Sequence, residues 1–427
     1  MNAGELLART LESLGVGAVY GAPLRGVEVV VSEPEAAGLL SRAHARLFGE
    51  RAAVHLGGGT LEVPPISSAA QVSSVLKIGS AAEIAELDAG RLSAGITLCV
   101  ELDLTQPTDL WPPDATSAET WSDPDERVVR HVREAGTVTI LCGPGVVKDR
   151  AVHGLHDLAA AGGLGVLNTW GAKGVFDWRS RHHFATAGLQ QDDFALGGLA
   201  DADLVIATGV DPLEAPPRLW SDYEHVSVEP SSLARLAELW PSARRTPDMP
   251  LLRDRLSIAT QAGWGDLRSP MKPSRVTLGY SRCFGSGGLV AADPGSAGYW
   301  VARTFATTEV GSVHVPAEPD SAGMAAACCL VARLESPTRA VLAAVDAPVR
   351  DEVSMVLETA ARLGVDLPVE VWDPDGARLD AEAHRIRLAR AALGGLHGTF
   401  SISTDPSQLD QMIDAAGPIV AWTPTGT

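Results

Sequence analysis

Short apolar runs rich in Val, Leu and Ala alternate with segments of helical periodicity along nearly the whole chain, and this alternation constrains the fold most. At the start of the chain it predicts a helix over 3–14, a strand over 16–21 and a helix over 34–48. Such alternation is typical of parallel sheets whose helical crossovers cover both faces. The sequence therefore predicts an α/β protein built from doubly wound parallel sheets.

Two stretches rich in Pro, Asp and Ser interrupt this alternation, at residues 104–126 and 262–276. Both lack hydrophobic periodicity and contain helix breakers. Since 427 residues are too many for one ordinary domain, we expect three domains, at 1–108, 125–262 and 275–427. The last is expected to close with a strand in PIVAWTP, residues 418–424.

The composition limits which partners the protein is expected to bind and in which cellular compartment it is expected to occur. A formal net charge of −19 disfavours binding to nucleic acid and to anionic membranes. The five cysteines form no CxxC pair, and the start of the chain reads as an amphipathic helix without a secretory signal. We therefore expect a soluble, cytoplasmic protein that binds neither membrane nor nucleic acid.

Two carboxylates in the third block follow predicted strands. Asp346 ends the run AVLAAVDA, and Asp373 ends LPVEVWD 27 residues later. In a parallel sheet both would emerge at the same edge, where their oxygens could hold Mg²⁺. The alternative is ordinary turn and helix-capping chemistry, because Asp next to Pro and Gly is common in turns.

Two glycine-rich turns also follow predicted strands. GPGVV at 143–147 precedes a helix and could offer backbone N–H groups to a phosphate, or could simply be a tight turn. Gly57 and Gly58 open a three-glycine turn, which permits either close approach of a ligand to the backbone or a plain reversal of the chain.

Taken together, the three blocks resemble the thiamine diphosphate-dependent enzymes of the acetolactate synthase and benzoylformate decarboxylase type. The closest match is ILCGPGVVKDRAVHGLHDLAAAGGLGVLNTWGAKGVFD with LADADLVIATGVDP in block two. Block three contributes VAADPGSAGYWVARTF and DSAGMAAACCLVARLESPTRAVLAAVD, and block one contributes LLARTLESLGVGAVYGAP. The resemblance implies a pyrimidine-binding-like domain, shortened here, then a central Rossmann-like domain, then a pyrophosphate-binding-like domain.

The resemblance also implies a site, on which this chain departs from the family. The implied cofactor-binding residues are Gly57, Gly58, Gly323, Met324 and Asp346, and the implied magnesium ligands are Asp346, Asp373 and Asp375. The family's Gly-Asp-Gly is VDA at 345–347 here, and its Asn-Asn is DPD at 373–375. An added Asp beside a diphosphate disfavours that ligand electrostatically.

The family's activating glutamate is a further departure. Its position falls on Pro34 here, and the carboxylates beside it are Glu33 and Glu35. Either could take the catalytic role only after a one-residue slip of the loop. The segment after GAPL and most of the region between the glycine turn and the last strand of block one are also missing relative to the family.

Three functions remain open on this sequence. The first is a pseudoenzyme that does not bind thiamine diphosphate in the usual way and serves as a binding or partner subunit, or hosts altered chemistry. The second is an active lyase or transferase that uses thiamine diphosphate and Mg²⁺ to decarboxylate or ligate 2-oxo acids. The third is a protein that binds FAD or ADP through the central domain. The resemblance implies a homodimer or homotetramer, or a heteromer with an intact paralogue.

Overall fold

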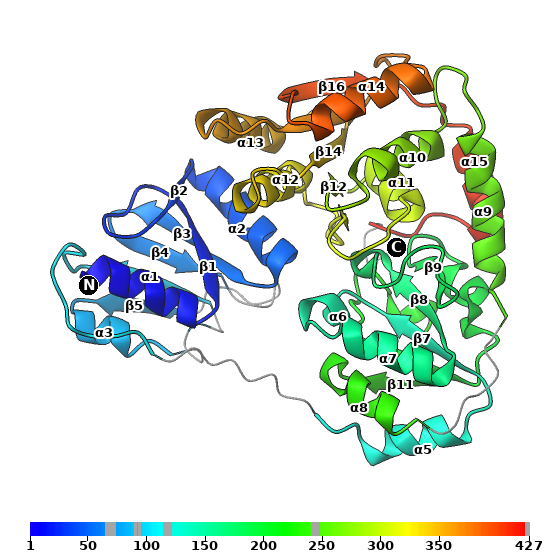
Figure 1. The fold of residues 1–427 in the computed structure, drawn as a ribbon, viewed down its shortest axis with the longest axis horizontal. Helices are drawn as coiled ribbons and strands as arrows, with labels where there is room; N and C mark the ends of the chain where they lie inside the picture. Colours follow the sequence, from blue (N-terminus) through cyan, green and yellow to red (C-terminus); the bar gives the residue numbers. More distant parts are fainter. Residues whose placement is uncertain (65–73, 89–91, 93–94, 114–121, 241–247, 423–427) are drawn as a thin grey trace. The chain divides into compact units, whose positions relative to one another are not determined.

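The chain divides into two compact units in the computed structural model (Figure 1). The described residues are 1–64, 74–88, 92, 95–113, 122–240 and 248–422. Unit 1 comprises residues 1–119 and 351–364, and unit 2 comprises residues 120–350 and 365–427. Three sheets with helices packed on them, one sheet in each predicted block, confirm the α/β class. The bounds of the three expected domains stay a prediction.

Within the described ranges, no helix combines the length and the apolar character that crossing a membrane requires.

The first sheet lies in unit 1 and is mixed, which corrects the expectation of three purely parallel sheets. Its strands are β1 (Val16–Gly21), β2 (Val30–Val31), β3 (Arg51–Gly57), β4 (Thr60–Val63), β5 (Ser74–Ile78) and β6 (Ile96–Val100). Their spatial order is β2-β1-β3-β4-β6-β5. Only β4 runs antiparallel to its neighbours, because a tight turn after β3 leaves no room for a helical crossover.

Local sequence signals set the helices of unit 1. They are α1 (Ala3–Ser13), α2 (Pro34–Phe48), α3 (Ala81–Ala85) and α13 (Asp351–Arg362). Asn2 and Glu5 form a capping box at the start of α1. Pro34 takes the first position of α2, and Gly49 ends that helix with a φ of 70°. Helix α13 packs against α2, although its sequence lies between two strands of the third sheet.

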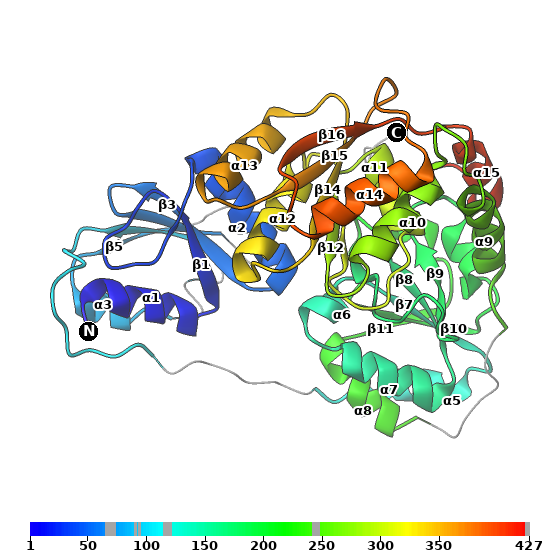
Figure 2. The same ribbon diagram turned by 45° about the horizontal axis from the view of Figure 1, so that its top comes forward.

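The second sheet is fully parallel, with the doubly wound order β11-β10-β7-β8-β9. Its strands are β7 (Val138–Cys142), β8 (Gly165–Thr169), β9 (His183–Ala187), β10 (Leu204–Thr208) and β11 (His225–Val228). The longer helices around it are α5 (Glu126–Glu134), α7 (Val152–Gly162), α8 (Leu233–Glu238) and α9 (Leu251–Trp264). The short helical segments are α6 (Gly145–Lys148), η1 (Trp170–Ala172), η2 (Ala195–Leu199), η3 (Pro217–Leu219) and η4 (Pro230–Ser232). Helices α5, α7 and α8 lie on one face of the sheet (Figure 2), and their apolar side chains pack on it. Apolar side chains of η2 and α9 pack on the other face.

The third sheet is also parallel, with the order β13-β12-β14-β15-β16. Its strands are β12 (Leu289–Ala292), β13 (Val313–His314), β14 (Val341–Asp346), β15 (Pro368–Trp372) and β16 (Gly398–Ile402). Its helices are α10 (Pro273–Phe284), α11 (Ser296–Thr304), α12 (Met324–Glu335), α14 (Ala381–Ala392) and α15 (Gln408–Ala416). Strand β16 was not predicted.

The predicted closing strand at 418–424 is wrong in the part that the structure describes, residues 418–422. Ile419 makes only an isolated bridge with Gln190, and Trp422 has a φ of 58°. The apolar side chains of the segment pack within unit 2, where the rings of Trp422 and Trp170 lie 5.6 Å apart. Residues 423 and 424 lie outside the described residues.

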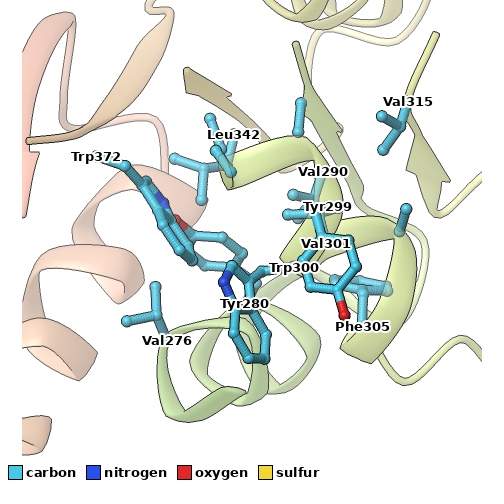
Figure 3. Packing of buried hydrophobic residues seen from close by; sticks show 14 of the residues in the cluster. Val276, Tyr280, Val290, Tyr299, Trp300, Val301, Phe305, Val315, Leu342 and Trp372 are labelled. Atoms are coloured by element: carbon cyan, nitrogen blue, oxygen red, sulfur yellow. The ribbon is translucent and has the colours of Figure 1, made fainter. Parts of the chain in front are cut away.

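A large core cluster lies around the third sheet, and Figure 3 shows buried side chains of it, Tyr280 and Trp372 among them. These two side chains belong to a buried polar network. Trp372 Nε1 donates to Tyr280 Oη at 2.9 Å, and the Tyr280 hydroxyl donates to Glu370 Oε2. His384 Nε2 lies 3.0 Å from Glu370 Oε1. Each buried polar group thereby has a partner, and burial with the nearby Glu370 carboxylate raises the pKa of Tyr280.

A buried ion pair joins the second and third sheets within unit 2. Arg303 on α11 donates to both oxygens of Asp193, at 2.8 and 2.7 Å, and also to Thr186 O. The backbone N–H groups of Leu189 and Gln190 donate to the same carboxylate. The Asp193 carboxylate is thus hydrogen-bonded on both oxygens, as a buried charge requires.

Candidate functional site

The carboxyl ends of β12, β14 and β15 meet at one edge of the third sheet, where ligands bind in open α/β folds. Asp346 is the last residue of β14, and Asp373 directly follows β15. The register pairs Asp346 with Trp372, so the two carboxylates leave adjacent strands as the sequence predicts. A third carboxylate, Asp293, follows β12 at the same edge.

Asp346 covers the N-terminus of α11. Its Oδ2 accepts a hydrogen bond from Ser296 N at 2.5 Å, and its Oδ1 accepts one from Ala297 N at 3.0 Å. The preceding Gly295 has a φ of 137°, and a Cβ at that position would lie 2.2 Å from Asp346 Oδ2. A glycine is therefore required for the carboxylate to reach the helix.

Burial and hydrogen bonding act on Asp346 in opposite directions. Burial raises the pKa of the half-buried carboxyl, while the N–H groups of Ala297 and Ser296 lower it, and burial has the larger effect. The positive end of the α11 dipole favours the ionised form in the same way as these hydrogen bonds. The side chain thus occupies the place that a bound anion would take at a helix start.

Asp293 does the same for α12. Its two carboxylate oxygens accept hydrogen bonds from Gly323 N and Ala325 N, each at 2.7 Å. Gly323 has a φ of 77°, and both it and Met324 are buried. The predicted cofactor residues Gly323 and Met324 therefore form a helix start whose N–H groups are bound by the chain itself.

Asp373 and Asp375 form a local turn at the end of β15. Asp373 Oδ1 accepts from Asp375 N at 2.9 Å, and Gly376 N donates to Asp373 O at the same distance. This is the turn chemistry that the sequence offered as the alternative to a metal site. Across the ranges that the structure describes, no group of three or more His, Cys, Asp or Glu side chains is arranged to hold a metal ion.

The two glutamates proposed as catalytic, Glu33 and Glu35, lie in unit 1 at the start of α2. Glu33 Oε1 lies 2.7 Å from Arg362 Nη1 of α13, and the two side chains are 64% and 50% exposed. Glu35, in the first turn of α2, is exposed as well. Both predicted catalytic carboxylates are therefore exposed at the start of α2.

Gly57 and Gly58 form a reversal between antiparallel strands. With Gly59, they link β3 to β4 at φ values of 101°, 59° and 80°. A Cβ on Gly57 or Gly58 would meet nothing within 4 Å, whereas one on Gly59 would lie 2.3 Å from Val100 O. Close backbone approach is thus evident only at Gly59, and there the neighbour is β6 rather than a ligand.

The backbone N–H groups of the GPG turn, which follows β7, also donate to other residues of the chain. Gly143 N donates to Thr208 O at 3.0 Å, and Gly145 N donates to Gly209 O at 2.9 Å. A Cβ on Gly143 would lie 2.3 Å from Gly209 O. The glycines therefore let β7 and β10 pack closely where they end.

A buried carboxyl group that the sequence did not reveal, Glu214, lies beyond the end of β10. Its Oε2 accepts hydrogen bonds from Gly171 N at 2.9 Å and from the Thr169 hydroxyl. Burial raises the pKa of Glu214 to about 7, and these hydrogen bonds only partly oppose the shift. The turn that follows β10 carries no sequence signal for a buried carboxyl group, so only the folded chain discloses Glu214.

Comparison with known families finds a match in the central part of the chain. Residues 126–239 match the family described as thiamine pyrophosphate enzyme, central domain. This span covers α5 through α8 and all five strands of the second sheet. No curated protein matches the sequence.

Proposed function

Since residues 126–239 belong to the thiamine pyrophosphate enzyme family as its central domain, we propose that this chain is a divergent member of the family. The edge of the third sheet that carries Asp293, Asp346 and Asp373 (the cofactor edge) is occupied by the chain's own side chains. It serves as a binding or partner subunit, or hosts altered chemistry, without binding thiamine diphosphate in the usual way. Fold alone does not fix the function, so the proposal rests on the chemistry of the edge.

The observation that carries the proposal is the position of Asp346. Its carboxylate takes the N–H groups of Ser296 and Ala297, the donors at the start of α11. A diphosphate placed there would compete for those donors and would meet a like charge. Two unit charges about 4 Å apart repel by roughly 4 kcal/mol at an effective dielectric constant of 20.

The other carboxylates at this edge of the third sheet also disfavour a bound diphosphate. Asp293 takes the donors at the start of α12, and Asp373 folds onto its own turn. Val345 and Ala347 flank Asp346 where the family has glycines. As arranged, these residues do not fit a diphosphate with its magnesium ion, so no reaction step is assigned to that cofactor.

Isothermal titration calorimetry tests the proposal. Thiamine diphosphate with Mg²⁺ and, in a separate series, inorganic pyrophosphate are titrated into the full chain, into Asp346→Ala and into Asp375→Ala, a control variant in the exposed turn. We expect no saturable heat from the wild type or from Asp375→Ala at millimolar ligand. We expect Asp346→Ala to bind inorganic pyrophosphate measurably, because the α11 donors are released.

Saturable binding of thiamine diphosphate by the wild type at micromolar concentration would overturn the proposal. It would favour instead an active, Mg²⁺-dependent enzyme that acts on 2-oxo acids.

The same family relation supports an oligomer. In the family that this chain resembles, the first domain of one subunit faces the third domain of its partner. We therefore propose a homodimer or homotetramer, with a heteromer containing an intact paralogue as the alternative. The heteromer would give this chain the role of a partner subunit beside a chain that binds the cofactor.

A further inference from the structure

Unit 2 has a hollow whose lining shares no residue with the edge formed by Asp293, Asp346 and Asp373. It has a volume of about 570 Å³, within the range of small-molecule pockets. One wall is helix α7, the second is the loop at 174–182, and the third is the segment 308–310. Valine and alanine side chains share the lining with a few polar groups, as is typical of ligand sites.

The walls are fixed to each other by backbone contacts. Gly174 has a φ of 91°, and a Cβ there would lie 2.1 Å from Glu309 O. Trp178 N donates to Thr307 O at 3.0 Å. The loop and the 308–310 segment are thus held together without a ligand, so the pocket is preformed.

Three aromatic rings line the hollow. The ring centroids of His156 and Phe176 lie 4.5 Å apart, and those of Phe176 and His182 lie 5.6 Å apart. Ring faces carry partial negative charge and attract flat or cationic groups. The hollow therefore offers an aromatic surface to a planar ligand.

The tautomer of His156 leaves a lone pair rather than an N–H group for a ligand, whereas both ring nitrogens of His182 are already hydrogen-bonded. His156 Nε2 faces Val175 O and therefore carries the proton, since a carbonyl oxygen only accepts. In the neutral ring, this leaves Nδ1 of His156 as an acceptor. His182 Nδ1 likewise donates to Leu164 O at 2.7 Å, and its Nε2 accepts from Arg181 Nε at 3.3 Å.

The charged side chains of the lining also favour a ligand that carries N–H donors. The lining contains two carboxylates, Asp177 and Glu309, and no Lys or Arg. The Arg179 guanidinium binds Asp177 and lowers the pKa of that carboxyl. Glu309 Oε1 accepts from Gly287 N at 2.6 Å, and Arg339, which lies outside the lining, acts electrostatically on the same carboxylate.

We propose that this pocket binds a small planar organic cation with N–H donors, such as an aromatic amidine or a protonated amino-heterocycle. The ring surface takes the flat face of the ligand, while Glu309 and His156 accept its N–H groups. The site is separate from the cofactor edge, and the proposal does not depend on whether that edge binds a diphosphate.

Benzamidine is the probe, with benzamide and benzoate as neutral and anionic counterparts of the same shape. Calorimetry and ligand-observed NMR are run on the full chain and on Glu309→Gln, His156→Leu and His153→Leu. His153 lies one turn earlier on α7, has an 85% exposed side chain and does not line the pocket. It is therefore a matched control for His156.

We expect benzamidine to bind with a Kd on the order of 1 mM or tighter, and benzoate not to bind. Glu309→Gln should weaken benzamidine binding by about tenfold, because it removes the charge but keeps an acceptor for Gly287 N. His156→Leu should weaken it by about threefold or more, and His153→Leu should leave it unchanged. Equal binding of the three probes, or an unchanged Kd in Glu309→Gln, overturns the proposal even if His156→Leu fails to fold.

Discussion

Glu214 shows what burial does to a single carboxyl group in this protein. The side chain is 3% exposed, beside the ends of β7 and β8. Burial raises the pKa of Glu214 to about 7 from an ordinary value of 4.5. The folded state therefore binds more protons than the unfolded state between these values, and stability falls as pH rises through this window.

Replacing Glu214 with Gln should remove this pH dependence. The amide oxygen can accept the hydrogen bonds from Thr169 and Gly171, and the side chain no longer ionises. Between pH 5 and pH 8, the free energy of unfolding of Glu214→Gln should rise relative to wild type by roughly 2–3 kcal/mol. Urea denaturation at several pH values measures this difference.

Asp203→Asn provides the control for that experiment. Hydrogen bonds from Thr137 lower the pKa of the exposed Asp203, so it titrates below the window. Its difference from wild type should stay constant between pH 5 and pH 8. A constant difference for Glu214→Gln as well would contradict a raised pKa at Glu214.

The residues of the cofactor edge could be predicted only in part. Parallel topology places Asp346 and Asp373 on neighbouring strand ends, and the sequence predicts that much. That Asp346 reaches back to α11 depends on a helix 50 residues earlier and on the φ of Gly295. Such a contact follows from tertiary packing and leaves no local pattern in the sequence.

At the scale of elements, helix starts at the cofactor edge depend on side chains from other segments. Asp293 binds the first N–H groups of α12 from the end of β12, whereas Asp380 caps α14 from the adjoining residue. Asp293 is buried and Asp380 is exposed. Without the Asp293 carboxylate, the two backbone N–H groups that it binds would have neither a protein acceptor nor water as a partner.

Asp293→Ala should therefore destabilise the protein by roughly 2–4 kcal/mol, because two buried N–H groups lose their partner. Asp380→Ala should cost only about 1 kcal/mol, the usual value for an exposed cap. Chemical denaturation of both variants at neutral pH measures the two changes. Equal losses would contradict the view that Asp293 holds the start of α12.

Elements with strong local signals were predicted well, and those without them were missed. Helix α2 has the predicted bounds, because Pro34 and Gly49 mark its ends. Strand β16 has the sequence GTFSI, whose glycine and hydroxyl residues resemble a loop. It forms a strand because β15 pairs with it over five residues.

For the whole molecule, the expected outcome is an oligomer. Mass photometry at nanomolar concentration and physiological salt should give a species of about twice the 44.6 kDa chain mass, or a larger multiple. The net charge of −19 makes subunits repel at low ionic strength, so the oligomer should be more populated as salt rises. A stable monomer across this range, alone and mixed with an intact paralogue, would contradict both proposed assemblies.

The path of the backbone through α13 affects how the molecule can come apart. The chain leaves unit 2 after residue 350, contributes α13 to unit 1 and returns at residue 365. Unit 1 thus consists of two pieces of chain, held together by α2 against α13 and by the Glu33–Arg362 pair. A protease cut between the first and second blocks would nick the protein without releasing a fragment, and truncation there would strip α13 of the surface on which it folds.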